Sequence, residues 1–266
     1  MPRKTLSILF ALALVSGVAV TAQNAAAQDV TAPAQAPSET LSDEARAALR
    51  AEIRAYLLDN PEVIFEAVAE YERRTAAAQA DMDVTLVEIN ADELFQDDIS
   101  WVGGNPEGDL TLVEFMDYRC SFCRRAFEPM MEFVEGDGNV RLVIKELPIL
   151  GRESEIMSRF AVAAHQLGGD EAYFAAHEAL YAWQGDLTDS GLQALAVTLG
   201  LDGEAVLDRM DDEAVTLVLQ RNRALAQRLQ ISGTPSFVLG DGLSGEMLRG
   251  MVPAAQLELL AAELRG

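Results

Sequence analysis

The sequence predicts an α/β protein in which an all-helical segment interrupts a sheet-forming domain. Residues 110–146 have the pattern of an apolar strand, an amphipathic helix and a second apolar strand, which is the unit of a parallel sheet. No strand candidate occurs in residues 153–229, and apolar extended segments resume at residue 234. We therefore expect one main domain at residues 81–266, with a helical insertion at about 153–229.

Composition narrows the class of protein. The chain has 43 acidic and 20 basic residues, a formal net charge of −23 at pH 7, and half of its 266 residues are hydrophobic. That hydrophobic content fills the core of a soluble globular protein without disulfide bonds. So acidic a surface repels phosphate backbones, and we do not expect nucleic acid as a partner.

The first 27 residues have the three parts of a secretory signal peptide. Arg3 and Lys4 form a basic start, residues 6–20 are apolar, and residues 25–27 are the small alanines of a cleavage site. The apolar run is shorter than the roughly 20 residues that a membrane-spanning helix needs. We therefore expect a protein that is exported to the periplasm, where disulfide chemistry is permitted, with its leader removed.

The segment after the leader predicts a linker and then a helical extension. Residues 28–40 are rich in Ala, Pro, Gln and Thr and predict a flexible linker. Residues 41–80 predict two amphipathic helices, separated by a break at Asn60 and Pro61. Two such helices cannot bury both apolar faces alone, so they either dock on the main domain or meet copies of themselves. We favour self-association into a homo-oligomer.

Less regular patterns fill the rest of the chain. Alternation at residues 82–89 indicates a short strand, residues 92–99 a short helix, and residues 103–109 a turn-rich loop. The insertion shows helical stretches around residues 154–167, 170–182, 190–199 and 203–229. Beyond it we expect a hairpin, turning at Gly240-Asp241-Gly242, and a final helix from Pro253.

Both cysteines of the chain stand in one Cys-x-x-Cys motif, Cys120-Ser-Phe-Cys123, between the first strand and the helix. A zinc site would want four ligands, and His165 and His177 lie far away in the helical segment, where we expect surface or packing roles. The motif therefore indicates a redox dithiol, ahead of a structural disulfide or a metal site. We expect no cofactor and no bound metal.

Position suggests how the dithiol works. Cys120 would lie at a helix N-terminus, where unpaired backbone N–H groups and the helix dipole stabilise a thiolate. It is the candidate nucleophile that forms a mixed disulfide with the substrate, and Cys123, one turn deeper, resolves it. A buried Cys123 needs a base, and Glu114 in the apolar strand could serve through water. The alternative is that Glu114 lies on an exposed face of the strand.

Thr234 and Pro235 open a later strand, and beside a Cys-x-x-Cys unit this pair suggests a cis peptide bond. The full set of matching motifs is Val113-Glu114-Phe115, Cys120-Ser121-Phe122-Cys123, Lys145-Glu146-Leu147-Pro148-Ile149-Leu150-Gly151 and Gly233-Thr234-Pro235-Ser236-Phe237. With these motifs, residues 86–266 resemble the DsbA family of thiol-disulfide oxidoreductases. The resemblance implies a thioredoxin-like fold with an inserted helical domain.

The same resemblance implies roles for individual residues. The first cysteine of the family is the nucleophile, a buried acid sits where Glu114 sits, and the cis-proline loop abuts the cysteines. That loop, with Thr234 and Pro235, binds substrate backbone as an added strand would, and Ser121 and Phe122 join the substrate-binding set. The implied partners are unfolded or misoxidised secreted proteins and a membrane redox partner that recycles the dithiol.

The helical extension resembles that of suppressor-of-copper-sensitivity C-type proteins, in which the segment oligomerises the catalytic domains. The direction of electron flow stays open. The strongly oxidising prototype of the family has Pro-His where this chain has Ser121 and Phe122, so one cation near Cys120 is missing. Thr234 before the proline is more similar to the isomerases. Net oxidation and disulfide shuffling are both compatible with the sequence.

A binding protein is the alternative to an enzyme. In that reading, the dithiol holds copper or protects client proteins without turnover, although the lack of nearby histidines argues against a strong copper site. Met130 and Met131 more simply fill the core. Residues 240–245 match the dinucleotide pattern Gly-x-Gly-x-x-Gly, but they stand in the expected hairpin and open no helix, so we expect no phosphate site there.

Overall fold

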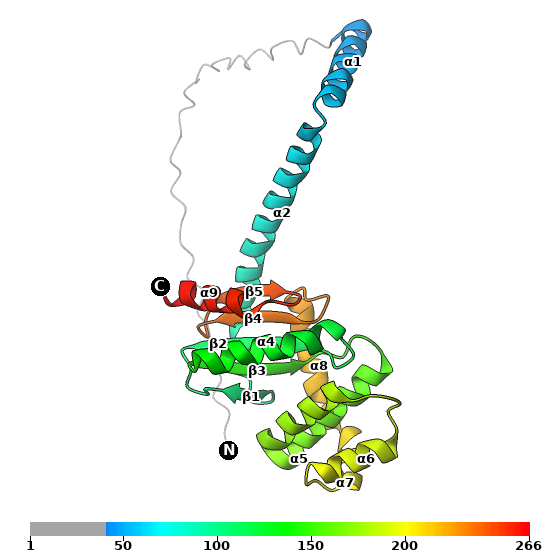
Figure 1. Ribbon diagram of the computed structural model, residues 1–266, viewed down its shortest axis with the longest axis vertical. Helices are drawn as coiled ribbons and strands as arrows, with labels where there is room; N and C mark the ends of the chain where they lie inside the picture. The colour runs from blue at the N-terminus through cyan, green and yellow to red at the C-terminus, as the bar shows by residue number, and fades with distance from the viewer. Residues whose placement is uncertain (1–40) are drawn as a thin grey trace, which may run out of the picture. The chain divides into compact units, whose positions relative to one another are not determined.

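The computed structural model describes residues 41–266, and its ribbon is shown in Figure 1. The predicted leader, residues 1–27, and the predicted linker, residues 28–40, lie outside the described residues. The chain divides into two compact units, of which the first ends at Pro61 and the second spans Glu62–Gly266. Each unit is a body of its own.

The described part of the first unit is helix α1, Asp43–Asp59. It begins after Ser42, whose hydroxyl accepts a hydrogen bond of 3.2 Å from the Ala45 N–H, as expected of a serine N-cap. It ends at Asn60, whose backbone N–H donates back to the Tyr56 carbonyl at 2.8 Å. None of its residues is buried, and most of its apolar side chains are exposed.

Helix α2, Glu62–Ile89, opens the second unit. The strand expected at residues 82–89 is wrong, because α2 continues through them, and the boundary predicted between residues 80 and 81 falls inside this helix. The buried residues here are Asp83 and Val87, which are four positions apart and share a helix face. Asp83 forms an ion pair with Arg249, which fastens the C-terminal part of α2 to the sheet.

Five strands form one sheet in the order β1-β3-β2-β4-β5 (Figure 1). Their bounds are β1 Trp101–Gly104, β2 Leu110–Met116, β3 Val140–Glu146, β4 Ser236–Gly240 and β5 Gly245–Arg249. β2 and β3 are parallel, as the strand–helix–strand pattern predicted, and the other pairs are antiparallel. The sequence does not predict β1, because Gly103 and Gly104 within it are typical of a turn-rich loop.

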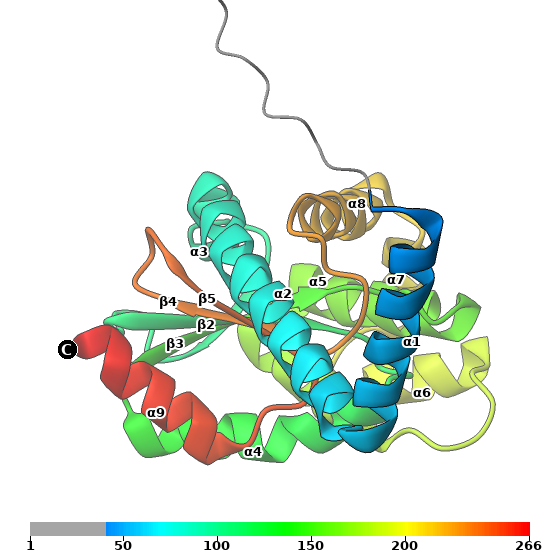
Figure 2. The ribbon, with the colours of Figure 1, turned by 90° about the horizontal axis from the view of Figure 1, so that it is seen from above.

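Helices cover both faces of the sheet (Figure 2). On one face lie α4, Ser121–Asp137, and α9, Ala254–Arg265, whose buried residues join the larger hydrophobic core. On the other face, a second cluster contains α3, Ala91–Phe95, with the ends of α2 and of α8, Glu213–Arg228. The side chains of β2 alternate between these two cores, so the strand is buried on both faces, as its apolar sequence predicted.

The insertion between β3 and β4 is helical, as predicted. It contains α5 Arg152–Ala182, α6 Asp189–Thr198, α7 Gly203–Met210 and α8 Glu213–Arg228. The two helices expected at 154–167 and 170–182 are joined in α5, with a kink at Gly169, whose φ of 75° is left-handed. The single helix expected at 203–229 is two, because the Asp212 carboxylate caps a new helix by accepting from the Ala214 N–H at 2.8 Å.

β4 and β5 form the predicted hairpin, and residues 240–245 make its turn. The Asp241 carboxylate accepts hydrogen bonds of 2.9 Å from the N–H groups of Leu243 and Ser244, which closes the turn. The Gly-x-Gly-x-x-Gly pattern therefore opens no helix, as expected. The final helix, α9, follows Pro253 directly.

Candidate active site

Cys120 caps the N-terminus of α4, and its Sγ accepts a hydrogen bond of 3.4 Å from the Cys123 N–H. The Cys120 N–H donates to the Asp117 carbonyl at 3.0 Å, and the Cys120 carbonyl accepts from the Arg124 N–H, so the motif begins the helix. Cys120 is 6% exposed, Cys123 is fully buried, and both are free thiols. The Cys120 sulfur thus lies at the start of the helix, where backbone N–H groups have no partner within the helix.

The cis-proline loop lies against Cys120. The Thr234-Pro235 peptide bond is cis, as predicted, and the Cys120 Sγ–H donates to the Thr234 carbonyl at 3.1 Å. The Pro235 carbonyl in turn accepts from the Gly250 N–H at 2.9 Å. Tertiary structure thus brings together two motifs that are 114 positions apart in the sequence.

Glu114 lies in the middle of β2 and is fully buried, so the alternative of an exposed strand face does not hold. Because strand side chains alternate, Glu114 shares the face of Leu112 and Met116, which is the face that α4 and Cys123 cover. Neither carboxylate oxygen has a hydrogen-bond partner within residues 41–266. Burial, with the nearby charges of Glu146 and Cys120, raises the pKa of Glu114 to about 8.

Cys123 needs help to ionise. Burial is the largest cause that raises the pKa of the Cys123 thiol far above its ordinary value, and the charge of Glu114 adds to it. A thiol in this state is a poor nucleophile until a base removes its proton. Glu114, on the same buried face, carries unused acceptor oxygens and is neutral over most of the physiological pH range.

Asp117 is a residue that sequence reasoning missed. Its buried carboxylate accepts hydrogen bonds from the backbone N–H groups of Arg119 at 2.8 Å, Ile149 at 2.8 Å and Leu150 at 3.0 Å. It therefore joins the cysteine loop to the loop that follows β3. The signal in the sequence is an aspartate directly after a buried strand, because its side chain can bond the N–H two residues on.

Exposed apolar side chains occur in the cysteine motif and in loops that are hydrogen-bonded to the site. Ser121 and Phe122 are exposed, and the guanidinium carbon of Arg125 lies 4.6 Å from the centre of the Phe122 ring. Two loops that are hydrogen-bonded to the site, at Asp117 and at Pro235, add exposed apolar side chains: Ile149 (41%), Leu150 (55%) and Met251 (47%). Such a surface is suited to an extended, partly apolar polypeptide.

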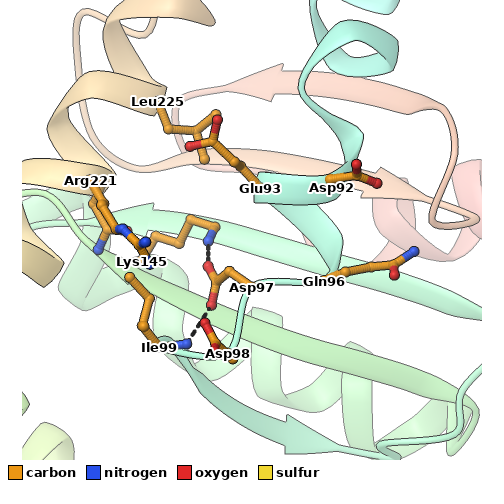
Figure 3. Close-up of a pocket in the computed structure, with 10 residues that line it drawn as sticks. Asp92, Glu93, Gln96, Asp97, Asp98, Ile99, Lys145, Arg221 and Leu225 are labelled. Carbon is orange, nitrogen blue, oxygen red and sulfur yellow. Dashed lines mark hydrogen bonds and ion pairs between the residues drawn. The ribbon is translucent and has the colours of Figure 1, made fainter. Parts of the chain in front are cut away.

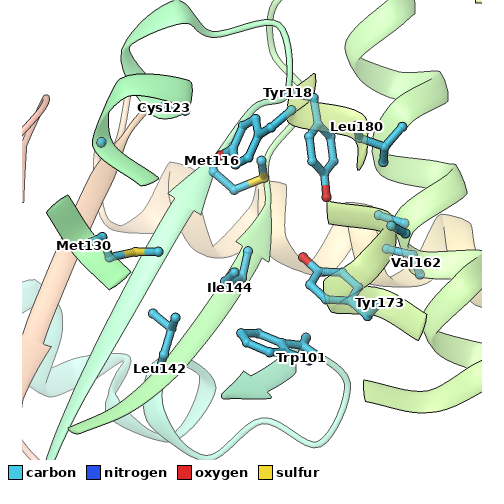
Figure 4. Close-up of a cluster of buried hydrophobic side chains, with 14 of the residues drawn as sticks. Trp101, Met116, Tyr118, Cys123, Met130, Leu142, Ile144, Val162, Tyr173 and Leu180 are labelled. Carbon is cyan, nitrogen blue, oxygen red and sulfur yellow. The ribbon is translucent and has the colours of Figure 1, made fainter. Parts of the chain in front are cut away.

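The other sequence candidates have packing or surface roles. Met130 is buried in the core cluster that also holds Cys123, Met116 and Tyr173 (Figure 4), and Met131 packs against that cluster. His165 pairs with the exposed Asp170 at 2.8 Å, and His177 is fully buried. Both have the expected surface or packing role, but His177 is not far from the cysteine motif, because its Nδ1 lies 2.9 Å from the Tyr118 hydroxyl oxygen.

A surface pocket of about 440 Å³ lies away from the cysteines (Figure 3). Its buried Lys145 forms an ion pair with Asp97, and burial lowers the pKa of Lys145 to about 7. Lys145 is paired in register with Phe115, whose side chain belongs to the second core, so it extends on the face of the sheet opposite Glu114. This pocket is not part of the dithiol site.

Solved structures of several bacterial proteins are similar to this chain. A thioredoxin-like oxidoreductase from Silicibacter pomeroyi DSS-3 is 41% identical, covering 65% of this chain and 96% of its own, with a TM-score of 0.59. Proteus mirabilis ScsC in a transitional conformation is 26% identical over 82% of this chain and 96% of its own, TM-score 0.59. A periplasmic thioredoxin-like protein from Salmonella enterica serovar Typhimurium is 27% identical over 68% and 97%, TM-score 0.56.

The curated relatives are much longer than the region in which they match this chain. The Na(+)/H(+) antiporter NhaA 1 of Salinispora arenicola is 28% identical over 137 residues, which are 51% of this chain and 21% of the antiporter. The chain thus spans about a fifth of the length of such relatives. In the described residues, 41–266, no helix has the length and apolar character that crossing a membrane requires.

Two family models match the chain. One described as "Copper resistance protein ScsC N-terminal domain" matches residues 46–78, within the helical extension. The other, described as "DSBA-like thioredoxin domain", matches residues 111–265, which include the cysteine motif, the helical insertion and the cis-proline loop. Both resemblances seen in the sequence are therefore confirmed, and with them the thioredoxin-like fold class. The chain belongs to the family of DsbA-like thioredoxin-domain proteins.

Proposed function

We propose that this chain is an extracytoplasmic thiol-disulfide oxidoreductase that forms or shuffles disulfides in secreted proteins through Cys120 and Cys123. The observation that carries the proposal is the contact of 3.1 Å between the Cys120 Sγ, at the N-terminus of α4, and the Thr234 carbonyl. A nucleophilic sulfur thus lies beside backbone that can pair with an extended substrate. Family membership supports the class of reaction.

The reaction has two exchange steps. When the site is a dithiol, the Cys120 thiolate attacks a substrate disulfide, one substrate sulfur leaves as a thiolate, and Cys120 keeps the other in a mixed disulfide. Cys123 then attacks the Cys120 sulfur, the second substrate thiolate leaves, and the pair becomes a disulfide. The substrate is reduced by two electrons. The reverse sequence oxidises a substrate dithiol, and release from Cys120 to a different substrate sulfur shuffles disulfides without net electron transfer.

Glu114 is the proposed acid and base for Cys123. The Cys123 proton passes to Glu114, directly or through one water, as Cys123 attacks, and it returns when Cys123 is the leaving group. A pKa of about 8 suits a group that must both accept and donate a proton near neutral pH. Unpaired carboxylate oxygens on the face shared with Cys123 support this role.

The substrates are unfolded or misoxidised secreted proteins. The backbone of Thr234, next to Pro235 and in contact with Cys120, is where a substrate strand would pair, and Ser121 and Phe122 provide an exposed surface beside Cys120. Net oxidation or reduction leaves the cysteine pair in the wrong state for another turnover, so a membrane redox partner is needed to recycle it. The predicted leader supports a periplasmic location, and the similar Salmonella enterica protein is described as periplasmic.

A refolding assay tests the proposal. The purified full chain is expected to speed recovery of activity of a secreted enzyme that has been reduced or scrambled at its disulfides, and Cys120→Ser is expected to abolish the effect. Equal rates with the variant and the wild type would refute it.

Stoichiometric copper binding by the reduced protein, without catalysis of refolding, would favour the binding-protein alternative. The segment matched by the copper-resistance family model, residues 46–78, contains no Cys, His or Met that could supply soft ligands.

We further propose that residues 41–80 assemble the chain into a homo-oligomer. In α1, the exposed apolar residues include Leu49 (48%), Ile53 (50%) and Tyr56 (55%). In α2 they include Ile64 (50%), Phe65 (74%), Val68 (48%) and Tyr71 (71%). Apolar side chains at such helical spacing and exposure are suited to an interface between helices.

Deleting residues 28–80 is expected to produce a monomer with an altered substrate preference, because the apolar helical faces are lost. Light scattering measures the mass of both forms. A full-length protein carrying Ile64→Glu and Val68→Glu should also be monomeric, whereas the control Glu66→Gln, on the same helix, should keep the parent mass. A wild-type mass equal to that of one chain would remove the proposal.

A further inference from the structure

Glu146, at the end of β3, is a second buried carboxylate near the cysteines. One carboxylate oxygen, Oε1, accepts hydrogen bonds from the Tyr118 hydroxyl at 2.8 Å and the Tyr173 hydroxyl at 2.7 Å. The other, Oε2, accepts from the Ser158 hydroxyl at 2.7 Å. Three neutral donors thus surround a side chain that is 2% exposed, and no lysine or arginine is hydrogen-bonded to it within residues 41–266. A charge held in this way depends on its hydroxyl donors.

The network continues to His177, and the hydrogen bond from Tyr118 to Glu146 determines which nitrogen of the His177 ring carries the proton. The Tyr118 hydroxyl has one proton, and it donates that proton to Glu146. His177 Nδ1, which is 2.9 Å from the same hydroxyl oxygen, must therefore be the donor in that contact. Nε2 is then a bare acceptor, which agrees with its having no partner in the described part of the chain. Burial lowers the pKa of His177 to about 3, so the ring is neutral.

Two features connect this network to the dithiol. Tyr118 stands two positions before Cys120, in the loop whose other anchor is Asp117. Glu146 is paired in register with Met116, so it extends on the face of the sheet that also carries Glu114 and Cys123. The hydroxyls of Ser158 and Tyr173 come from α5, so the helical insertion completes the network.

We propose that Glu146 is a positioning residue for the dithiol: it holds Tyr118, and with it the loop that presents Cys120, and it places a buried negative charge on the sheet face of Glu114. This inference rests on the proposed role of Glu114 as base for Cys123. Through the loop, Glu146 sets where the sulfur of Cys120 lies. Through its charge, it sets the pH at which Glu114 gives up its proton.

Electrostatics support the second effect. Burial raises the pKa of Glu146 to about 7, although hydrogen bonds from its three hydroxyl donors act to lower it. The charge of Asp117 also raises this pKa. After burial, the charge of Glu146 is the largest cause that raises the pKa of Glu114. The titratable groups that face Glu146 come from β2, the cysteine loop and α5: Glu114, Asp117, Tyr118, Tyr173, His177 and Tyr181.

Replacing Glu146 with glutamine tests the effect of its charge separately from its effect on the position of the cysteine loop. Glu146→Gln keeps a side-chain oxygen for the two tyrosines, and its amide can donate to Ser158, so the loop stays in place while the charge is lost. The probe is oxidised glutathione, which reacts with the reduced protein to give first the mixed disulfide and then the Cys120–Cys123 disulfide. The rate of the second step, followed by stopped flow and mass spectrometry, should rise with pH around a midpoint near 8 in the wild type, where Glu114 ionises.

In Glu146→Gln, this midpoint should fall by about 1 pH unit, because a like charge beside Glu114 is gone. Glu146→Ala should also slow the first step, which requires Cys120 in place. Two serines of α5 provide a matched pair. Ser158→Ala should lower the midpoint by a smaller amount, since Glu146 loses a donor that favours its charge, whereas Ser154→Ala, equally buried but without a partner in the described residues, should leave it unchanged.

The outcomes distinguish this inference from the proposed function. A Glu146→Gln midpoint equal to that of the wild type, in a protein whose Glu114→Gln variant has lost the pH dependence, overturns the role of Glu146 and leaves Glu114 as base. An unchanged pH profile in Glu114→Gln overturns both. Loss of thermal stability in Glu146→Gln with no shift of the midpoint would show a purely structural residue, and would also overturn the proposal.

Discussion

Cys123→Ala is expected to stop the reaction at the mixed disulfide. Cys120 still attacks a substrate disulfide, because its position at the helix N-terminus does not depend on the Cys123 sulfur. No second thiol is then available in the protein, since the chain has only two cysteines. Substrate release should therefore depend on an external thiol, and the internal step should fall to an undetectable rate.

Mass spectrometry of acid-quenched samples measures the trapped species. Cys123→Ala should accumulate a covalent adduct, whose added mass is that of the part of the substrate joined to Cys120 in the mixed disulfide. Cys120→Ser, as control, should form little or none. Cys123→Ala and Cys120→Ser would exchange these results if the deeper cysteine were the nucleophile. That exchange is not expected, because Cys123 is fully buried and burial raises the pKa of its thiol far above the ordinary value.

Glu114→Gln is expected to slow the reaction and stabilise the fold at the same time. Loss of a positioned base slows the attack of Cys123 on the mixed disulfide by roughly 100-fold, the lower end of the usual contribution of general bases. The variant should nevertheless be more stable than the wild type. The folded wild type holds Glu114 with a pKa of about 8, well above that of an exposed glutamate, and this difference costs stability near neutral pH. Such a combination is typical of a functional group that costs stability.

The pH dependence of stability follows from the direction of that pKa change. Between about pH 4.5 and pH 8, the unfolded chain ionises Glu114 while the folded protein keeps it protonated, so folding becomes less favourable as pH rises. Gln avoids this cost. Its free energy of unfolding at pH 7 should exceed that of the wild type by about 2 to 4 kcal/mol, and the difference should vanish below pH 4.

Urea unfolding at pH 7 and pH 4 measures this difference, and Ser154→Ala serves as a buried substitution without an ionisable group. Equal stabilities of Glu114→Gln and wild type at both pH values would mean that Glu114 is not held protonated by burial. Equal rates of the internal exchange step would exclude it as the base.

Local patterns predicted much of the fold. The strand, helix and strand at residues 110–146 could be read because apolar periodicity in β2, α4 and β3 agrees with their burial. The break at Asn60 and the hairpin at residues 240–245 follow from turn chemistry that acts over a few positions. Elements whose partners are distant are harder to predict: the alternation at residues 82–89 predicts a strand where the structure has α2, and no local pattern predicts β1.

The same difference applies to the site. Cys120 and Cys123 could be identified because their spacing and the following helix are local, and Pro235 could be added from its motif. For Asp117 the sequence signal covers only the local bond to the Arg119 N–H, and its partners Ile149 and Leu150 could not be predicted because they come from another loop. The environment of Glu146 also depends on distant residues. One of its donors comes from the cysteine loop, and the other two, Ser158 and Tyr173, come from well-separated positions of the inserted helix α5.

The sequence by itself determined the class of chemistry, since a dithiol at the start of a helix has few other uses, and it determined the order of the elements around that dithiol. Only the tertiary structure decided which groups control the dithiol. Whether Glu114 is a solvated carboxylate or a buried acid depends on α4 covering the sheet, and whether Glu146 has donors depends on α5 packing beside it. Burial and hydrogen bonds between distant segments set these properties, and no local pattern encodes them.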